Sequence, residues 1–463
     1  MVKHKIYNLR KLSFPFLTIS FLALCLGMNS CELESIHASI AVDFDSNTDC
    51  YQVAFNTNSQ GAYSWDFGDG TSSEEQNPVH FYEERGTYEV SLTVRSETGA
   101  GKRSKSISIN PSGNTFRQSL SSYNGNRMFP QVDGQKYRLT AKGFGERFNS
   151  LLDFSANGQF ESVYDAGSAS RDYLAFFNPV AGTTHTIYND SLNSTVVYTY
   201  VGTGARLDGL FKSDTSFVAH DVSMGVNESV FITGNYTSAL SNQSGVFVWS
   251  ANLFPDNIIY FDFLQPYSPS NLASIDIEAT SDGGAVLATF VPGQGIYVLK
   301  INNAGQSVWG RYINNSNFQI STSVGSAFNF EYLVSIVPLT ANDFVVGIST
   351  RDLGTEGGAV FFRLNETTDS WRTDWEGFAR LRDMIPSKDG HIMACGAYNK
   401  NNLLVPYFMK LNPAGEIQFA KEILDISEGN TLVNMLETDN DEFVLLGNGQ
   451  NMDLFRVDCG GNF

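Results

Sequence analysis

The sequence has few charges, few prolines and few cysteines for its length, and each shortage excludes a class of protein. Charged residues make up 17% of the 463 positions, with 13 prolines and 5 cysteines. A chain that is also 13% aromatic is too apolar to be disordered. So few cysteines do not form the dense disulfide framework of a small secreted domain. Basic residues are scarce as well, 30 against 49 acidic ones, which argues against a nucleic-acid binder.

The chain also lacks the short motifs of the common enzyme classes. It contains no HExxH or CxxC pattern, no GxSxG nucleophile elbow, no GxxxxGK[ST] phosphate loop and no S-x-D-x-G-x-x-W box. The histidines are scattered along the sequence. We therefore expect no catalytic residues of these types, no metal site and no cofactor.

The first thirty residues have the pattern of an export signal. Four basic residues within 1–11 precede an apolar run over 12–26, which is short of the roughly twenty residues that span a membrane. The run ends at Met28-Asn29-Ser30-Cys31 and resembles a bacterial lipoprotein signal. That resemblance implies that Cys31 is lipidated and becomes the mature N-terminus. The alternative is ordinary signal cleavage, with Cys31 a free thiol.

A short acylated tether, residues 31–35, follows the signal. It contains Glu32 and Glu34, which resemble export signals that send some lipoproteins to the outer face of the outer membrane. We therefore expect a lipid-anchored outer-membrane protein exposed at the cell surface. Retention on the periplasmic leaflet is the alternative.

Residues 36–110 alternate short β-rich runs with turn clusters, which indicates a β-sandwich. The centre reads YSWDFGDGT over 63–71, and GTYEVSLTV follows over 86–94. The segment resembles a PKD (polycystic kidney disease) domain, an Ig-like module. The family is non-catalytic, and its members act as spacers or contact proteins and polysaccharides. Trp65 and Phe67 alternate with Asp66, so the two aromatic rings share one face of a strand.

Two features of this segment invite a ligand. His80 is the first, but the resemblance implies a structural role for it. The second is the run D-x-D-x-N-x-D over 43–49, which is similar to the start of a calcium loop. Thr48 and Ala54 stand where such a loop needs glycine and glutamate. We therefore favour two strands joined by a polar turn.

Beyond a linker at 110–114, residues 115–463 repeat. Each unit has a polar turn, a strand, a loop, a second strand, a turn with glycine, and a third strand. The polar turns fall at positions 133, 227, 282, 342, 389 and 440. A diverged copy near Ser194–Tyr198 fills the one double-length gap. The spacing predicts a seven-bladed β-propeller of four-stranded blades, with a β-solenoid as the alternative.

The last unit ends after its third strand, at the end of the sequence. Residues Thr115–Ser121 precede the first unit, and we expect them to supply the missing fourth strand and close the ring. The units resemble the Asp-Gly-Gly propeller repeats of exported bacterial proteins and, more distantly, quinoprotein-type repeats. The second resemblance does not imply a quinone cofactor.

Three cysteines remain between the tether and the end of the sequence: Cys50, Cys395 and Cys459. Cys395 and Cys459 lie in neighbouring repeats and could form a disulfide. We favour the alternative, in which they are small buried thiols.

Loops on a rigid scaffold carry recognition, and the longest insertions are the first places to look. The stretch 252–272 holds our candidate ligand-binding patch, which comprises Tyr260, Phe261, Phe263 and Tyr267. The favoured function is non-catalytic binding or scaffolding through the propeller loops, with the PKD module as spacer. The expected partner is an outer-membrane protein complex or an extracellular glycan, and not nucleic acid.

The alternative function is a carbohydrate-active hydrolase or lyase with its site on the propeller axis. The residues at the axis discriminate between the two. Three or more acids, or an acid with histidine and arginine, favour the enzyme. An axis lined by backbone and small residues favours binding.

Overall fold

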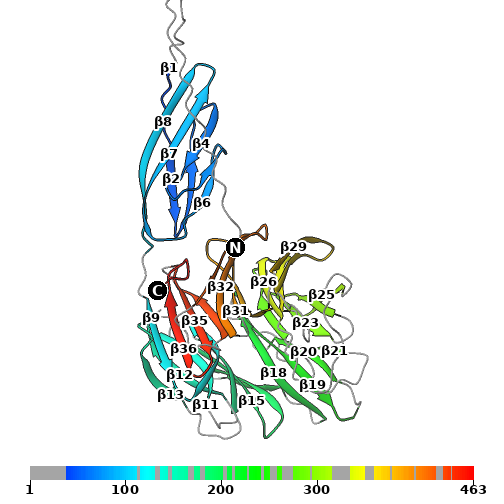
Figure 1. Ribbon diagram of the computed structural model, residues 1–463. Helices are drawn as coiled ribbons and strands as arrows, with labels where there is room; N and C mark the ends of the chain where they lie inside the picture. Colours follow the sequence, from blue (N-terminus) through cyan, green and yellow to red (C-terminus); the bar gives the residue numbers. More distant parts are fainter. Residues whose placement is uncertain are drawn as a thin grey trace, which may run out of the picture.

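In the computed structural model, the elements of the described residues are β-strands, and they form two domains (Figure 1). The structure describes these residues: 38–111, 115–130, 136–143, 149–164, 171–177, 183–201, 206–210, 214–226, 229–240, 244–250, 258–262, 275–291, 295–314, 334–349, 359–375, 378–400, 403–423, 431–438 and 441–462. The expected signal peptide, the tether and Cys31 lie outside them. Within this part of the chain, no helix is long and apolar enough to cross a membrane.

The first domain, the N-terminal sandwich, packs a five-stranded sheet against a three-stranded sheet. The first sheet has the order β1-β8-β7-β4-β5 and the second β2-β3-β6. The strands are β1 Ala38–Ser39, β2 Asp45–Asp49, β3 Gln52–Asn56, β4 Ala62–Asp66, β5 Ser72–Ser73, β6 Val79–Phe81, β7 Gly86–Ser96 and β8 Gly99–Ile109. Trp65 and Phe67 are both buried in the core between the sheets, as their alternation predicts.

Seven four-stranded antiparallel sheets make up the second domain. Blades 1 to 3 comprise β10 Tyr123–Pro130, β11 Lys136–Gly143, β12 Asn149–Ser155, β13 Phe160–Tyr164; β14 Arg171–Phe177, β15 Thr184–Asp190, β16 Thr195–Val201, β17 Arg206–Leu210; β18 Thr215–Met224, β19 Val230–Ser238, β20 Ser244–Ser250 and β21 Ile258–Asp262. Blades 4 and 5 comprise β22 Ile275–Ala279, β23 Ala285–Val291, β24 Gly295–Ile301, β25 Ser307–Asn314; β26 Val334–Thr340, β27 Asp343–Ser349, β28 Ala359–Leu364 and β29 Asp369–Trp375. Blades 6 and 7 comprise β30 Phe378–Pro386, β31 Ile392–Lys400, β32 Leu403–Leu411, β33 Ile417–Glu422; β34 Thr431–Glu437, β35 Phe443–Asn448, β36 Met452–Val457 and β9 Phe116–Leu120.

The blades form a closed ring. The first strand of each blade contacts the first strand of the next, and β34 of blade 7 contacts β10 of blade 1. These seven inner strands therefore surround one axis, which is the arrangement of a seven-bladed propeller. The diverged copy near Ser194–Tyr198 is confirmed, because β16 of blade 2 begins at Thr195.

The expected closure of the ring is confirmed too. Strand β9 pairs with β36 as the outermost strand of blade 7, with Gln118 opposite Leu454. Figure 1 shows β9 and β36 side by side beside the C-terminus. The last blade thus takes one strand from the start of the domain, and the closed ring leaves it no unpaired edge at that point.

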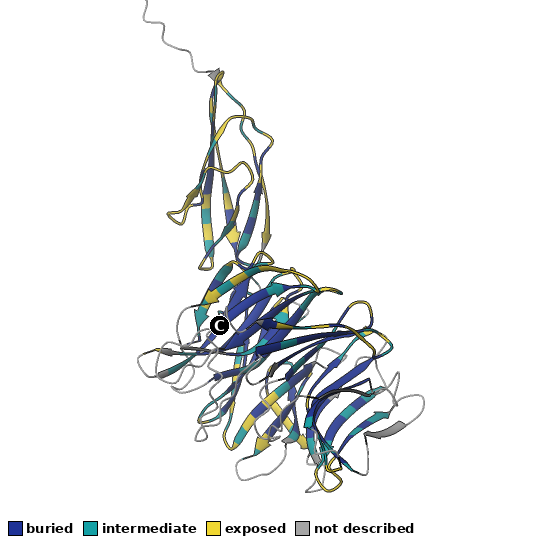
Figure 2. Cartoon of the chain, turned by 90° about the vertical axis from the view of Figure 1, so that its right-hand side faces the viewer, coloured by how far each residue is buried: buried dark blue, intermediate teal, exposed yellow. Residues whose placement is uncertain are grey.

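The middle strands of the blades are apolar on both faces because each blade packs between two others. In β19 the first seven residues are all buried. One core cluster joins Val286 of blade 4 to Val346 of blade 5, and another joins Phe361 of blade 5 to Met409 of blade 6. The outermost strand β29, by contrast, has no fully buried residue. Figure 2 shows the same trend as dark blue strands within the blades.

The Asp-Gly-Gly turn has a distinct task for each residue. Asp282 accepts a hydrogen bond from the Gly284 N–H (3.1 Å) and pairs with the buried Lys300 ammonium (3.0 Å). Gly283 has φ of 83°, in the left-handed region. A Cβ on Gly284 would lie 2.1 Å from the Ile301 carbonyl oxygen. The turn motif is therefore structural in blade 4.

A similar acid–base pair recurs in other blades. In each case it joins a residue at or next to the polar turn to a residue of the third strand. The pairs are Asp343 with Arg363, Asp389 with Lys410, and Glu442 with Arg456. Each pair ties a turn to the strand beneath it. These charges are consequently used within the blades and are poor candidates for ligand binding.

Candidate functional site

A cavity of about 200 Å³ lies on the propeller axis. Five of the seven inner strands carry a β-bulge at the same level, and a bulge re-aims the extra side chain. The bulged residues are Asn126, Leu174, His220, Arg382 and Val433. In the other two blades, Ile275 and Val334 are the first residues of the inner strands β22 and β26. All seven of these residues line the cavity, and we call them the axial ring.

Three members of the axial ring are polar and four are apolar. Asn126 comes from blade 1, His220 from blade 3 and Arg382 from blade 6. His220 and Arg382 are three blades apart in a ring of seven, so they stand on roughly opposite sides of the axis. Asn126 is exposed, and Nε2 of His220 lies 2.9 Å from the side-chain amide nitrogen of Asn235. The ring therefore offers separate polar groups with apolar spacers between them.

The residue after each ring position forms a second layer, and four of these residues hold neighbouring blades together. Asp221 accepts from the Ile277 N–H of blade 4 (2.8 Å), and Asp276 accepts from the Ile336 N–H of blade 5 (2.7 Å). The same bond recurs when Asp383 accepts from Met435 N–H of blade 7 (2.9 Å). Each side chain thus acts as a latch between two blades.

The fourth latch closes the ring of blades. Asn434 of blade 7 accepts from the Met128 N–H of blade 1 at 2.8 Å. A backbone N–H buried between blades must be paired or it costs stability. The latch side chains meet that requirement where no strand ladder reaches.

A second set of latches supports the residue just before the bulge. Asn189 of blade 2 bonds both backbone groups of Ala219 in blade 3, at 2.8 and 3.0 Å. Asn448 of blade 7 does the same for Gly125 of blade 1, and Ser349 of blade 5 bonds Leu381 of blade 6. A bulge disrupts the local ladder, and these polar side chains compensate for it.

Blade 1 departs from the latch pattern because Arg127 occupies the latch position. Its guanidinium pairs with Asp221 of blade 3 and lies 4.0 Å from Glu278 of blade 4. Glu278 also accepts a hydrogen bond from the Ser223 hydroxyl at 2.9 Å. Arg127 therefore reaches over blade 2 and forms a charged floor beneath the axial ring.

Burial dominates the acid–base behaviour of the axis. It raises the pKa of Glu278 to about 8 and the pKa of Asp383 to about 7, against the opposing pull of Arg127. The pKa of Asp276 is raised for the same reason. Burial also lowers the pKa of His220, and the nearby Asp172 opposes that change. At neutral pH, Glu278 is mostly protonated and His220 is uncharged.

The axis is therefore not lined by backbone and small residues. Asp221, Asp276 and Asp383 share the cavity with His220 and Arg382, which meets the criterion that favours an enzyme. An uncharged imidazole can accept a proton and a guanidinium can stabilise an anion. The same groups can equally bind a polar ligand, and the carboxylates already serve as latches. In the described part of the chain, no group of three or more His, Cys, Asp or Glu is placed to hold a metal ion.

The predicted aromatic patch does not take part in this site as far as the structure describes it. Tyr260 and Phe261 lie in β21, the outermost strand of blade 3, opposite Phe247 and Val246. Two strands separate β21 from the inner strand β18. Their side chains, and all of Phe263 and Tyr267, lie outside the described residues, so the patch stays a prediction.

The axial residues carry a signal in the sequence. Arg127, Asp221, Asp276, Asp383 and Asn434 each stand six positions before a polar-turn anchor. A polar residue at a fixed place in an otherwise apolar inner strand marks a position that faces the axis. The bulges that bring His220 and Arg382 beside them leave no such mark.

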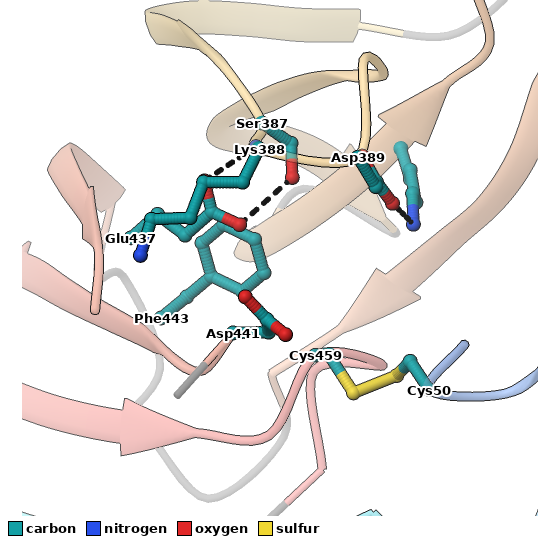
Figure 3. Close-up of a pocket in the computed structure, with 9 residues that line it drawn as sticks. Cys50, Ser387, Lys388, Asp389, Glu437, Asp441, Phe443 and Cys459 are labelled. Carbon is teal, nitrogen blue, oxygen red and sulfur yellow. Dashed lines mark hydrogen bonds and ion pairs between the residues drawn. A yellow bond between two sulfur atoms is a disulfide. The ribbon is translucent and has the colours of Figure 1, made fainter. Parts of the chain in front are cut away.

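The two domains meet at a joint built on the last turn of blade 7. Cys50 of the sandwich forms a disulfide with Cys459, across 409 positions of sequence (Figure 3). A pairing of Cys395 with Cys459 is therefore excluded, and the favoured free thiol is wrong for Cys459. It is confirmed for Cys395, which is a buried free thiol. Cys395 lies in the core between blades 6 and 7, and the partly buried Cys459 packs against that core.

Asp458 is the polar centre of the joint. Its carboxylate is fully buried, and it accepts hydrogen bonds from the Tyr51 hydroxyl and the Arg85 guanidinium, both at 2.8 Å. Burial alone would raise the pKa of Asp458, but these bonds and the Asn462 N–H hold it below its ordinary value. Phe81 of the sandwich also stacks on Phe419 of blade 6, with ring centroids 5.5 Å apart.

The joint arises where blade 7 departs from the repeat. In blades 4 and 6 the corresponding turns begin with Asn302 and Asn412, whose side chains accept two backbone N–H bonds each. Asp458 keeps that geometry, bonding the N–H groups of Gly460 and Asn462. The added charge is what Arg85 binds. The exchange of asparagine for aspartate thus converts a turn into a docking point.

A second cavity of about 240 Å³ lies beside the disulfide (Figure 3). Its charged lining is already engaged: Glu437 accepts bonds from Ser387 (3.0 Å) and from the Lys388 N–H (2.8 Å), and Asp389 pairs with Lys410. These bonds belong to the turns of blades 6 and 7. We therefore assign this cavity to the joint.

The two ligand candidates of the N-terminal sandwich have structural partners. His80 bonds Asp69 at 2.7 Å and stacks on Phe67 with centroids 4.0 Å apart, which supports the structural role. Residues 45–49 form strand β2, which pairs with β3 as a hairpin. The prediction of two strands joined by a polar turn is therefore confirmed, and the calcium-loop interpretation is not supported.

Comparison with known proteins identifies the first domain. Residues 38–110 match the family described as the PKD domain. The chain is 58% identical to collagenase ColA of Bacillus cereus over 38 residues, which are 8% of this chain and 4% of the collagenase. It is 37% identical to collagenase ColA of Clostridium perfringens over 73 residues, 16% and 7% of the two chains. It thus spans less than a tenth of each of these relatives.

Solved structures similar to most of the chain have low sequence identity to it. They include virginiamycin B lyase from Staphylococcus aureus (TM-score 0.42, 9% identity, 74% of this chain and 99% of the other) and oligogalacturonate lyase from Vibrio parahaemolyticus (0.43, 8%, 75% and 98%). A prolyl endopeptidase gives 0.46 at 11%, over 74% and 48%. The architecture itself rests on the sheet order and the closed ring of inner strands. Residues 38–110 are a PKD domain, and a seven-bladed propeller follows it.

Proposed function

We propose that this protein is an exported, lipid-anchored recognition protein that binds its partner without chemical change. The observation that carries the proposal is the axial ring, where bulges turn Asn126, His220 and Arg382 toward one cavity. Structural turns and latches consume most other polar groups of the propeller. In the ring, polar groups from three distant blades converge on one cavity, and convergence of that kind typifies a ligand site.

The second layer supports binding over catalysis. Oδ2 of each of Asp221, Asp276 and Asp383 accepts a hydrogen bond from a backbone N–H of a neighbouring blade. Glycoside cleavage needs two carboxyl groups that are free to protonate and to attack or activate water. A carboxylate that must hold two blades together is poorly suited to that task.

The partner that suits a polar, axial cavity is an extracellular glycan. An outer-membrane protein complex would instead use the outer rims of the blades, where loops provide a broad surface. The PKD domain then serves as a spacer between anchor and propeller. The proposal has three further parts. The propeller units belong to the Asp-Gly-Gly repeat family, Cys31 carries the lipid anchor, and the protein is exposed at the cell surface.

A carbohydrate-active hydrolase or lyase is the second candidate. His220, Arg382 and Asp383 share one cavity, and a neutral histidine beside a guanidinium can serve as a general base. This candidate requires that the ligand be cleaved during binding. Binding and cleavage are therefore to be measured on the same sample.

The test is to cross-link tagged protein in its native membrane and identify what co-purifies. Glycan recovered at its original length supports the proposal, and a protein complex without glycan would redirect it to the blade rims. Shortened chains, new reducing ends or unsaturated sugars formed by the pure protein would establish the enzyme instead. Cys31→Ala tests the anchor, because it should release the protein from the membrane fraction.

A further inference from the structure

The shape of the axial cavity restricts how a ligand enters. Seven inner strands enclose it in a closed ring, so a ligand reaches it along the axis. Arg127 and Asp221 both line the cavity and form an ion pair there. A chain-like ligand therefore has to enter end first.

The size of the cavity sets how much of the ligand fits. Its volume is about 200 Å³, below the roughly 300–1,000 Å³ of pockets that hold drug-sized molecules. A single ring-sized unit fits such a space, and a second linked unit does not. The remainder of the ligand must stay outside the ring.

The groups around the cavity favour hydroxyls over charged groups. Arg382 and Asn126 donate hydrogen bonds, and the carboxyl oxygens of Asp383 accept them. His220, whose Nε2 lies 2.9 Å from the Asn235 amide nitrogen, contributes through its other ring nitrogen. A hydroxyl both donates and accepts, so it can use this mixture. Apolar Leu174, Ile275, Val334 and Val433 lie between the polar groups and suit the C–H faces of a sugar ring.

A strongly charged ligand fits less well. Arg127 already offsets Asp221, so neither sign of charge is left in clear excess at the floor. An anion entering the cavity meets the carboxyl groups of the second layer, and a cation meets Arg382 and Arg127. An uncharged polyol avoids both repulsions.

Resting on the proposed function, these observations narrow the ligand: we infer that the axial cavity binds the terminal, uncharged sugar unit of a glycan, inserted end-on. His220 and Arg382 hold its hydroxyl groups from opposite sides of the axis. Asn126 adds a third polar contact. The rest of the glycan stays outside the ring.

Saturation-transfer NMR on the full mature protein tests this inference. The probes are the methyl glycosides of glucose, galactose and mannose, their homotrisaccharides, and the charged analogues methyl glucuronide and methyl glucosaminide. We expect transfer to a neutral probe, concentrated on one terminal ring of its trisaccharide. His220→Ala and Arg382→Gln should weaken binding at least tenfold. Arg372→Gln, an exposed residue on the outer strand β29, is the matched control and should bind as the wild type does.

Thermal unfolding confirms that each variant is folded, and Asn126→Ala, at an exposed position, replaces any variant that is not. Equal transfer to every ring of a trisaccharide would overturn end-on insertion. Tenfold tighter binding of a charged analogue than of its neutral parent would overturn the uncharged class, and lack of binding by every probe would overturn the inference as a whole. The proposed function fails separately, if membrane cross-linking recovers no glycan.

Discussion

The joint at Asp458 and the axial ring around His220 are both built from departures from the blade repeat, but they treat charge in opposite ways. In the joint, bonds from Tyr51, Arg85 and Asn462 outweigh burial and lower the pKa of Asp458. On the axis, burial outweighs the available partners and raises the pKa of Asp383 and Glu278. A fully paired buried charge fixes a structure, whereas buried groups with raised pKa values are typical of functional sites.

This difference explains why one departure joins domains and the other forms a cavity. The joint adds one negative charge where an arginine of the other domain can bind it. The axis gathers several acids around Arg127, which cannot pair with all of them. Predictions that alter each region separately can therefore break or sharpen the comparison.

The largest effect is expected from removing the covalent part of the joint. The double variant Cys50→Ser with Cys459→Ser should lower the free energy of unfolding by about 3 kcal/mol, because the disulfide links segments far apart in sequence. Calorimetry should show two separated transitions where the wild type unfolds as one. Wild-type protein under reducing conditions is the control and should match the variant. Unchanged unfolding would show that the disulfide does not couple the domains.

Removing the charge of the joint should have the next largest effect. Asp458→Asn at pH 7 should cost about 2 kcal/mol, less than for a fully buried pair because Arg85 is 39% exposed. The native pKa of Asp458 lies below the ordinary 3.8. The stabilisation from its charge is therefore fully present above pH 3.8 and is lost as the pH falls through the native pKa. The deficit of the variant should therefore shrink near pH 2.

A matched substitution tests whether burial causes that loss. Asp45 is an aspartate of the N-terminal sandwich, and its side chain is 97% exposed beside Lys105. Asp45→Asn should change the free energy of unfolding by less than about 0.5 kcal/mol. An effect as large as that of Asp458→Asn would contradict the role of the buried network.

The axis should respond to pH with the opposite sign. The native pKa of Asp383, about 7, lies above its ordinary 3.8, so the folded protein binds an extra proton between these values. The free energy of unfolding should therefore fall as the pH rises from about 4 to 7. Asp383→Asn keeps an acceptor for the Met435 N–H and removes this dependence. Denaturation should be measured at pH 5 and at pH 8. Between these values, the free energy of unfolding should fall by about 1 kcal/mol less in the variant than in the wild type.

The smallest effect is expected from placing the joint residue in an ordinary blade. Asn302→Asp gives blade 4 the aspartate of blade 7 and keeps the oxygen that accepts from Ala304 and Gln306. No arginine of the PKD domain is known to bind it there. The free energy of unfolding should stay within about 0.5 kcal/mol of the wild type. A large change would mean that the turn itself, and not docking, selects asparagine.

Much of the architecture followed from local patterns. The alternation of Trp65 and Phe67 predicted the sandwich core, and the spacing of the polar turns predicted seven blades. The strand over Phe116–Leu120 followed from a topological rule, because a ring with one strand missing has an open edge. These features depend on periodicity, which a sequence displays directly.

The joint and the axis depended on the arrangement of distant parts. Cys50 and Cys459 are 409 positions apart, and only the docked domains show that they meet. Asp458 in place of asparagine was a visible departure, but its meaning depends on Arg85. The bulges at His220 and Arg382 follow from packing of whole blades, so no local pattern marks them.

The measurement that tests the central claim most directly follows glycan length and retention together on one sample. Purified mature protein is incubated with extracellular polysaccharide, and the retained fraction is sized against the input. The account predicts that the wild type retains glycan of unchanged length. The variants His220→Ala and Arg382→Gln should each retain at least tenfold less glycan. Shortening of the polysaccharide by the wild type, abolished in these variants, would contradict it.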